Sequence, residues 1–279
     1  MQPIVVAVDF SNTSIHAIEY AIPLAVKMNA GIELIWVDKN NPSEAIYPDT
    51  THQIRDEAKK RFDEIVKKYS KKLGKDLKME YRLRKGKIYN EIDNLARSIG
   101  AACIIAGAHG ISGFEEFWMG SNAFKIVSYA SCPVITVRCD FAIGNGIRKI
   151  LLPIDSTPET LQKIPFALML ARLFNSEVHV IATHSSHLKS IQRLAENYAQ
   201  QAVRYLEKNK IKPYRDALVA GDITQAVLEY ASRMEIDLIS IMTEQETPAN
   251  ILLGPHAQQL VNQSPIPVLS THPRENFCL

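Results

Sequence analysis

Hydrophobic positions follow two different periods that alternate along the chain. Short apolar runs rich in β-branched residues are separated by longer segments in which apolar residues recur at helical spacing. The first five runs lie at residues 4–8, 32–37, 77–83, 102–106 and 134–137. Strands that alternate with helices in this way predict an α/β fold, with a parallel, doubly wound sheet and helices on both of its faces.

One of the intervening segments, residues 52–73, has the pattern of a long amphipathic helix. Its apolar residues fall on one side: Ile54, Ala58, Phe62, Ile65, Val66 and Tyr69. The lysines of the basic run at residues 67–78 fall mostly opposite that side. We interpret this run as a solvated helix face and not as a site for an anionic partner.

The whole pattern occurs twice. Each copy begins with an apolar run that ends in an aspartate, Asp9 in the first copy and Asp155 in the second. Similar residues then recur at matching positions, as in the pairs Ala21 and Ala167, Leu24 and Leu170, Asn29 and Asn175, Gly86 and Gly221, and Pro133 and Pro267. The segment AIGNG at residues 142–146 is typical of a linker. We therefore predict two tandem Rossmann-like or flavodoxin-like domains, 1–141 and 147–279, each with a five-stranded parallel sheet.

Composition narrows the function. The chain has 279 residues, of which 46% are hydrophobic and 22% charged. A net charge of +2 lacks the basic excess expected of a dedicated nucleic-acid binder, and no apolar run has the length of a membrane span. The start MQPIVVAVDF resembles a strand and not a signal peptide, and the four cysteines have no metal-ligand spacing. A cytoplasmic location without nucleic-acid or membrane partners is expected.

The stretch GAHGISGFEEFWMGSNAF contains the residues of the first copy that could bind a phosphate group. Its glycines and serine are spaced G-x2-G-x9-G-S, between an apolar run and an amphipathic helix. Glycine lets backbone N–H groups approach an anion, and a helix N-terminus adds unpaired N–H groups and a positive dipole end. Gly107 and Gly110 would line one wall of a phosphate site, with Gly120, Ser121 and Asn122 on the other. The alternative is a pair of ordinary turns.

Over nearly its whole length, the chain resembles a tandem member of the universal stress protein family. The ATP-binding motif of that family, G-x2-G-x9-G-[S/T], is matched by Gly107, Gly110, Gly120 and Ser121. The resemblance implies that Asp9, at the end of the first strand, lies near adenine and ribose. It also implies a backbone contact from Val37 to adenine. ATP with Mg²⁺ is therefore the expected ligand of the first copy.

The resemblance also implies how the copies meet. Family members commonly dimerise through their last strands, which in this chain are PVITV and PVLST. The two copies would pair these strands in an antiparallel junction and form a pseudo-dimer within one chain. Whether two chains associate further into a homodimer, and which protein partners the chain has, are left open.

The second copy departs from the motif. Its segment MTEQETPANILLGPHAQ is one residue shorter, with Met242 and Gln245 in place of the first two glycines and Pro255 in place of the serine. Proline has no N–H to offer a phosphate, and Glu244 and Glu246 would add like charge beside it. We predict that the second copy does not bind ATP in the same way.

These observations favour a cytoplasmic stress-response regulator that binds ATP in its first domain and changes conformation or partner contacts with the nucleotide. The first alternative is a weak ATPase or phosphotransferase that uses the same pocket. The sequence has no Walker lysine, clear general base or arginine finger, so we assign no catalytic residue and no metal-ligating side chain. The second alternative is a scaffold that works without nucleotide.

Overall fold

The computed structural model describes residues 2–38, 48–74, 76–108, 121–144, 146–185, 188–243 and 254–273. The first copy contains β1 Ile4–Ala7, α1 Asn12–Met28, β2 Ile32–Asp38, α2 Pro48–Leu73, β3 Met79–Lys85, α3 Ile88–Ile99, β4 Cys103–Gly107, α4 Ser121–Tyr129 and β5 Val134–Val137. The second contains β6 Lys149–Ile154, the 3-10 helix η2 Pro158–Leu161, α5 Ile164–Phe174, β7 Glu177–His184, α6 Lys189–Lys208, β8 Tyr214–Val219, α7 Ile223–Arg233, β9 Leu238–Met242, α8 Pro255–Gln263 and β10 Val268–Thr271.

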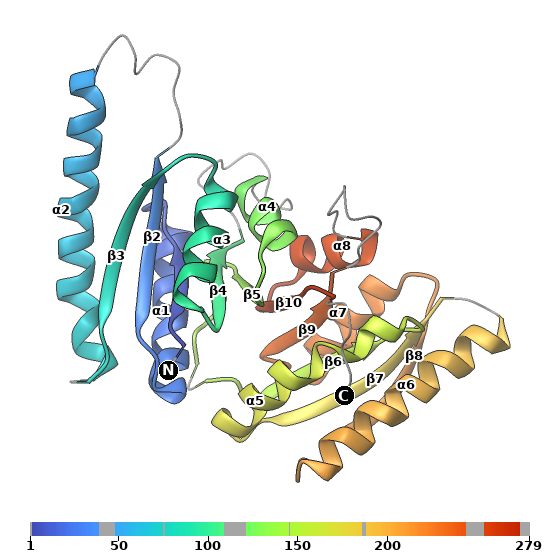
Figure 1. Ribbon diagram of the computed structural model, residues 1–279. Coiled ribbons are helices and arrows are strands. Elements are labelled where there is room, and N and C mark those ends of the chain that lie inside the picture. Colours follow the sequence, from blue (N-terminus) through green and yellow to red (C-terminus); the bar gives the residue numbers. More distant parts are fainter. Residues whose placement is uncertain are drawn as a thin grey trace.

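All of these strands form one ten-stranded sheet in the order β3-β2-β1-β4-β5-β10-β9-β6-β7-β8 (Figure 1). Within each copy, neighbouring strands are parallel. The copies meet where β5 and β10 pair antiparallel, with Ile135 opposite Leu269. The predicted fold is confirmed: two five-stranded α/β units are joined as a pseudo-dimer.

Helices cover both faces of the sheet, and each face has a core that runs through both copies. One cluster of buried side chains packs under α1, α2, α5 and α6, and the other under α3, α4, α7 and α8. Central strands such as β4 and β9 are buried almost throughout, as expected for a parallel sheet covered on both sides, whereas the outer strands β3 and β8 are largely exposed. The two units therefore share their hydrophobic cores across the junction.

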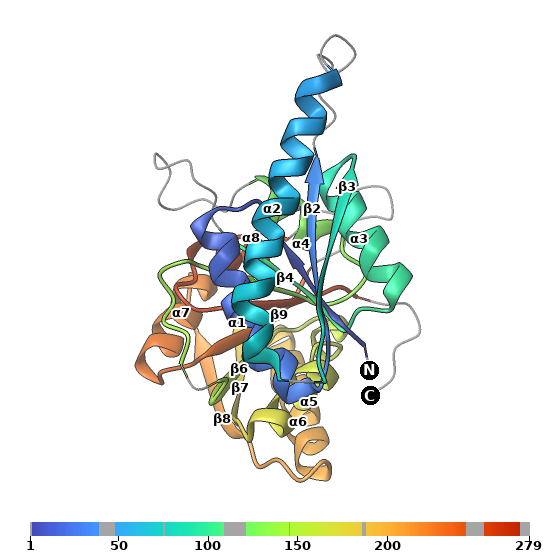
Figure 2. The same cartoon turned by 90° about the vertical axis from the view of Figure 1, so that its left-hand side faces the viewer.

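The long amphipathic helix is α2, which begins at Pro48, four residues before the predicted start. Phe62 and Tyr69 are buried, as the pattern predicts, but Ile54 is 48% exposed. The N-terminal part of α2, which carries Ile54, projects beyond β2 and β3, where no sheet is present to cover it (Figure 2). The solvated face is confirmed, because the lysines on it are exposed: Lys67, Lys68, Lys71 and Lys72.

The two copies differ in their first helix. In the first copy, Ser11 caps α1 by accepting a hydrogen bond from the Ser14 N–H, and the helix is continuous to Met28. In the second copy, the corresponding residues form η2 and then α5. Pro165, near the start of α5, has no N–H to donate to the carbonyl of Leu161, which is compatible with a helix start at this place.

Within the described residues, no helix combines the length and the apolar character needed to cross a lipid bilayer.

Candidate functional site

A cavity of about 520 Å³ lies in the first copy at the carboxyl ends of β1, β2 and β4. The chain leaves β1 toward β2 on one side and later returns to β4 on the other, so this is the point where the strand order reverses. Open α/β sheets bind ligands at such points. The cavity is also within the size range of small-molecule sites.

Most of the residues predicted to bind nucleotide share this cavity. Its lining includes Asp9, Val37, Gly107, Ser121 and Asn122. The other two predicted residues, Gly110 and Gly120, lie outside the described residues. The topology therefore brings together side chains that are far apart in the sequence.

The carboxylate of Asp9 has a local structural role in addition to its place in the cavity. Its Oδ1 accepts a hydrogen bond from the Ser11 N–H at 3.0 Å, and the Asp9 N–H donates to Ser14 Oγ at 3.3 Å. These bonds fix the turn that leads from β1 into α1. The side chain is exposed, so its second oxygen, Oδ2, remains accessible to a ligand.

The second copy builds the same turn. Asp155 Oδ1 accepts from the Thr157 N–H at 2.7 Å, and the Asp155 N–H donates to Thr160 Oγ1 at 3.2 Å. The aspartate at the strand end is thus a turn residue in both copies. Its presence alone does not distinguish a nucleotide site from a structural turn.

Gly107 is constrained by packing. A Cβ atom placed on it would lie 2.7 Å from Thr13 Cγ2, closer than side chains tolerate. The end of β4 can therefore approach the first turn of α1 only because this residue has no side chain. In the second copy, Met242 takes this position and Glu159 of η2 stands where Thr13 is.

The opposite wall of the cavity is the start of α4. Ser121 is its first residue and Asn122 its second, and both are exposed. The first N–H groups of a helix have no partner within it and carry partial positive charge. In the second copy, α8 begins with Pro255 directly after Gly254, so one of these donors is missing.

The described lining of the first cavity contains no lysine, arginine or histidine, but it does contain Asp9 and Asp38. Among the described lining residues, the N-terminus of α4 is therefore the main source of positive potential. In the part of the chain that the structure describes, no group of three or more His, Cys, Asp or Glu side chains is arranged to hold a metal ion.

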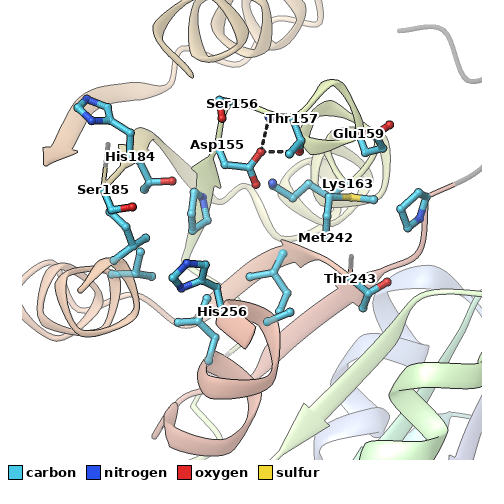
Figure 3. Close-up of a pocket in the computed structure, with 18 of the residues that line it drawn as sticks. Asp155, Ser156, Thr157, Glu159, Lys163, His184, Ser185, Met242, Thr243 and His256 are labelled. Carbon is cyan, nitrogen blue, oxygen red and sulfur yellow. Dashed lines mark hydrogen bonds between the residues drawn. The ribbon is translucent and has the colours of Figure 1, made fainter. Parts of the chain in front are cut away.

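A second cavity, of about 690 Å³, occupies the equivalent place in the second copy (Figure 3). Asp155, Met242 and His256 line it, together with Lys163, which the sequence analysis did not single out. Lys163 stands at the position of the buried Ala17 of the first copy. Comparing the two copies position by position, rather than only their motifs, would have found this difference.

Lys163 is only 1% exposed. Its Nζ donates a hydrogen bond to Thr160 Oγ1 at 2.9 Å. Burial lowers the pKa of this amine to about 8, although the nearby Asp155 carboxylate acts in the opposite direction. Removal from water disfavours the charged form of an amine, and here this effect outweighs the attraction of the carboxylate.

Fold and cavities together define a tandem, doubly wound α/β protein with one ligand cavity in each copy, at the carboxyl ends of its strands. The chain belongs to the universal stress protein family, whose sequence profile matches residues 1–138 and 146–272.

Individual relatives match either one copy or the whole chain. The universal stress protein YxiE of Bacillus subtilis is 30% identical over 146 residues, which are 48% of this chain and 96% of that protein. A universal stress protein of Methanocaldococcus jannaschii is 28% identical over 137 residues, 48% of this chain and 81% of that protein. The crystal structure of a universal stress protein from Archaeoglobus fulgidus has a TM-score of 0.79 at 17% identity. It covers 97% of this chain and 98% of its own, which shows the tandem fold.

Proposed function

We propose that the first copy binds ATP together with Mg²⁺, and that the chain is a stress-response regulator whose conformation or partner contacts depend on this nucleotide. The observation that carries the proposal is the first cavity, whose described lining combines Gly107 and Ser121 of the family motif with strand-end residues such as Asp9. The second copy also has a cavity, so the lining distinguishes the two: in the first cavity a glycine ends β4 and the start of α4 has no proline, whereas Met242 and Pro255 stand there in the second copy.

Val37 is well placed to contact adenine through its backbone. The β1–β2 ladder ends at the pair Ala7 and Ile35, after which the Val8 N–H donates to the Ile35 carbonyl. Backbone groups of residues two apart in a strand point to the same side. The N–H and C=O of Val37 therefore point past the end of β1 toward the cavity, where they can bond to the edge of a base.

Asp9 Oδ2 would accept a hydrogen bond from a ribose hydroxyl or from the adenine amino group. Ser121 and Asn122 would donate backbone N–H groups to phosphate oxygens, as helix N-termini do for anions. Gly107 keeps β4 close to α1 at the base of the cavity.

The charge of the cavity supports the participation of Mg²⁺. Without a cationic side chain in the described lining, the phosphates would rely on the start of α4 and on a metal ion for neutralisation. Magnesium binds readily through substrate phosphates and retains several waters, so it needs no cage of protein side chains. Removal of Mg²⁺ should therefore weaken ATP binding.

The test is titration calorimetry of the full chain with ATP, in the presence of Mg²⁺ and again with EDTA. The variant Ser121→Pro gives the first copy the residue that begins α8 in the second copy, where proline is compatible with a helix start. It removes one backbone donor and one hydroxyl. A hydrogen bond to a charged group contributes about 1.5–3 kcal/mol, so we expect at least a tenfold loss of affinity.

The matched control is Pro255→Ser, which makes the reciprocal change in the second copy and should leave the affinity for ATP unchanged. Analysis of the nucleotide after the titration distinguishes binding from slow hydrolysis. Normal ATP affinity in Ser121→Pro, or no ATP binding by the unmodified chain, would refute the proposal.

A further inference from the structure

Lys163 is a buried cation whose nearest carboxylate, that of Asp155, raises the pKa of the amine without forming a close ion pair with it. Among the described residues, no Asp or Glu oxygen lies within 4.0 Å of its Nζ, and its hydrogen bond is to the hydroxyl of Thr160. The equivalent Ala17 of the first copy packs in the core. A buried charge that forms one hydrogen bond and no close ion pair is costly, so a group that completes its environment would be bound favourably.

The lysine is among the residues that line the second cavity although it is only 1% exposed, so a bound group would meet it at the cavity wall. Figure 3 shows its amine directed toward Asp155, and the side chain of Glu159 turned away. Asp155 Oδ1 is already occupied by the N–H and the hydroxyl of Thr157. The ammonium has three N–H donors, of which Thr160 Oγ1 accepts one, so a further acceptor can be accommodated beside it.

The rest of the cavity is largely apolar. Side chains of α6, α7, β9 and α8 form these walls: Ile191, Ile223, Val227, Ile241, Met242 and Leu260. Polar groups are concentrated at the strand ends and at the start of α8, where His256 takes the place of Asn122. The cavity is thus apolar on one side and has a buried cation on the other.

We propose that the second cavity binds an organic monocarboxylate, whose carboxylate pairs with the ammonium of Lys163 and whose apolar body lies against the walls contributed by α6, α7 and α8. A single negative charge is favoured because Asp155 and Glu159 already line the cavity and would repel a multiply charged group. A nucleotide is disfavoured because Met242 and Pro255 replace the glycine and the N–H donor of the first copy.

This inference does not depend on ATP binding by the first copy, since it concerns another cavity and another class of ligand. The probe is sodium octanoate, with 1-octanol as an uncharged compound of the same chain length. Calorimetry on the full chain should show octanoate binding at least tenfold more tightly than octanol, and saturating ATP should not displace it.

Lys163→Met removes the charge and keeps a side chain of similar length. In this variant, octanoate should lose its tenfold advantage over octanol, whereas octanol should bind as before. Lys67→Met is the matched control, because Lys67 is an exposed lysine on α2 and its replacement should leave octanoate binding unchanged.

A measurement on the unmodified chain makes the test independent of the variants. The pKa of the Lys163 amine, followed by NMR of ¹⁵N-labelled lysine, should rise toward the ordinary lysine value of about 10.4 when octanoate binds. Equal binding of octanoate and octanol would overturn the proposal, as would unchanged octanoate affinity in Lys163→Met or displacement of octanoate by ATP or inorganic phosphate. A Lys163 pKa that does not move on binding would overturn it as well.

Discussion

At equivalent positions, some residues have the same structural role in both copies and others differ. Both copies build the same strand-end turn, with the aspartate Oδ1 bonded to a backbone N–H two residues later. They differ at Gly107, which lines the first cavity and is replaced by Met242, and at the buried Ala17, which is replaced by Lys163 of the second cavity. The repeat therefore preserves the scaffold of a ligand site while the chemistry of the site has changed.

The glycine at the end of β4 leads to a prediction at this scale. Gly107→Ala places a Cβ 2.7 Å from Thr13 Cγ2, so the end of β4 or the first turn of α1 must move. Overpacking of this kind typically costs about 1–3 kcal/mol. We expect the free energy of unfolding, measured by urea denaturation, to fall by about that amount.

Thr13→Ser is the matched control, because it removes the clashing Cγ2 and keeps the hydroxyl. In the double variant, part of the loss should be recovered, which a double-mutant cycle would measure. If Gly107→Ala unfolds at the same urea concentration as the unmodified chain, the contact does not explain the glycine.

The candidate site could be predicted in part from single residues. The motif spacing led to Gly107, Ser121 and Asn122 because helix starts and glycine turns depend on local sequence. The contact between Gly107 and Thr13 could not be predicted, because it depends on how β4 approaches a helix far away in the chain. Lys163 was missed for a similar reason: a lysine usually faces solvent, and only the packing shows that this one, at the start of α5, is buried.

At the scale of elements, the helices at the junction depend on both copies. The Val127 carbonyl lies in the last turn of α4, where helix carbonyls lose their usual partners. The Ser131 N–H, which would have continued the pattern, donates to Asp93 Oδ1 instead at 2.7 Å. His272 of the second copy donates from Nε2 to this carbonyl, and its Nδ1 is hydrogen-bonded to Thr243 Oγ1 at 2.6 Å.

This arrangement predicts a pH dependence. Burial lowers the pKa of His272 below its ordinary value, although the hydrogen bond to Val127 acts in the opposite direction. The unfolded chain therefore binds the proton more tightly than the folded chain. The contribution of neutral His272 to stability is complete above a pH of about 6.5, the pKa of an unperturbed histidine, and is lost as the pH falls through the lower folded pKa.

His272→Gln retains a side-chain donor for Val127 but does not titrate. Urea denaturation of both proteins between about pH 7.5 and pH 5 would compare their free energies of unfolding. The difference in free energy of unfolding between the unmodified chain and the variant should shrink as the pH falls. The contributions of the other histidines are the same in both proteins and cancel in this difference. A difference that stays constant with pH would show that His272 is not titrating as proposed.

At the scale of the whole molecule, the antiparallel pairing of β5 and β10 makes one sheet out of two units. The alternation of strands and helices predicts each unit, and the resemblance to the family predicts the junction; the sequence pattern alone contains no signal for it. The outer strands β3 and β8 carry several charged side chains, including Arg82 and Arg215. Charges on edge strands hinder pairing with another chain, which disfavours a further sheet between molecules.

Because one hydrophobic cluster includes side chains from both copies, we expect the chain to unfold as a single unit. This is a demanding prediction, since two-state unfolding is usual only below about 150 residues. Leu269→Ala tests it, because Leu269 is fully buried in β10 opposite Ile135 of β5. Removing such a side chain costs about 2–5 kcal/mol. Calorimetry should show one transition at lower temperature, and hydrogen exchange should increase in β4 of the first copy as well as in β9 of the second.

Leu206→Ala, a change at a buried position of α6 away from the junction, should have the same effect on both copies if the chain is cooperative. Two separate transitions, or faster exchange confined to the second copy, would mean that the shared sheet holds the copies together without coupling their stability.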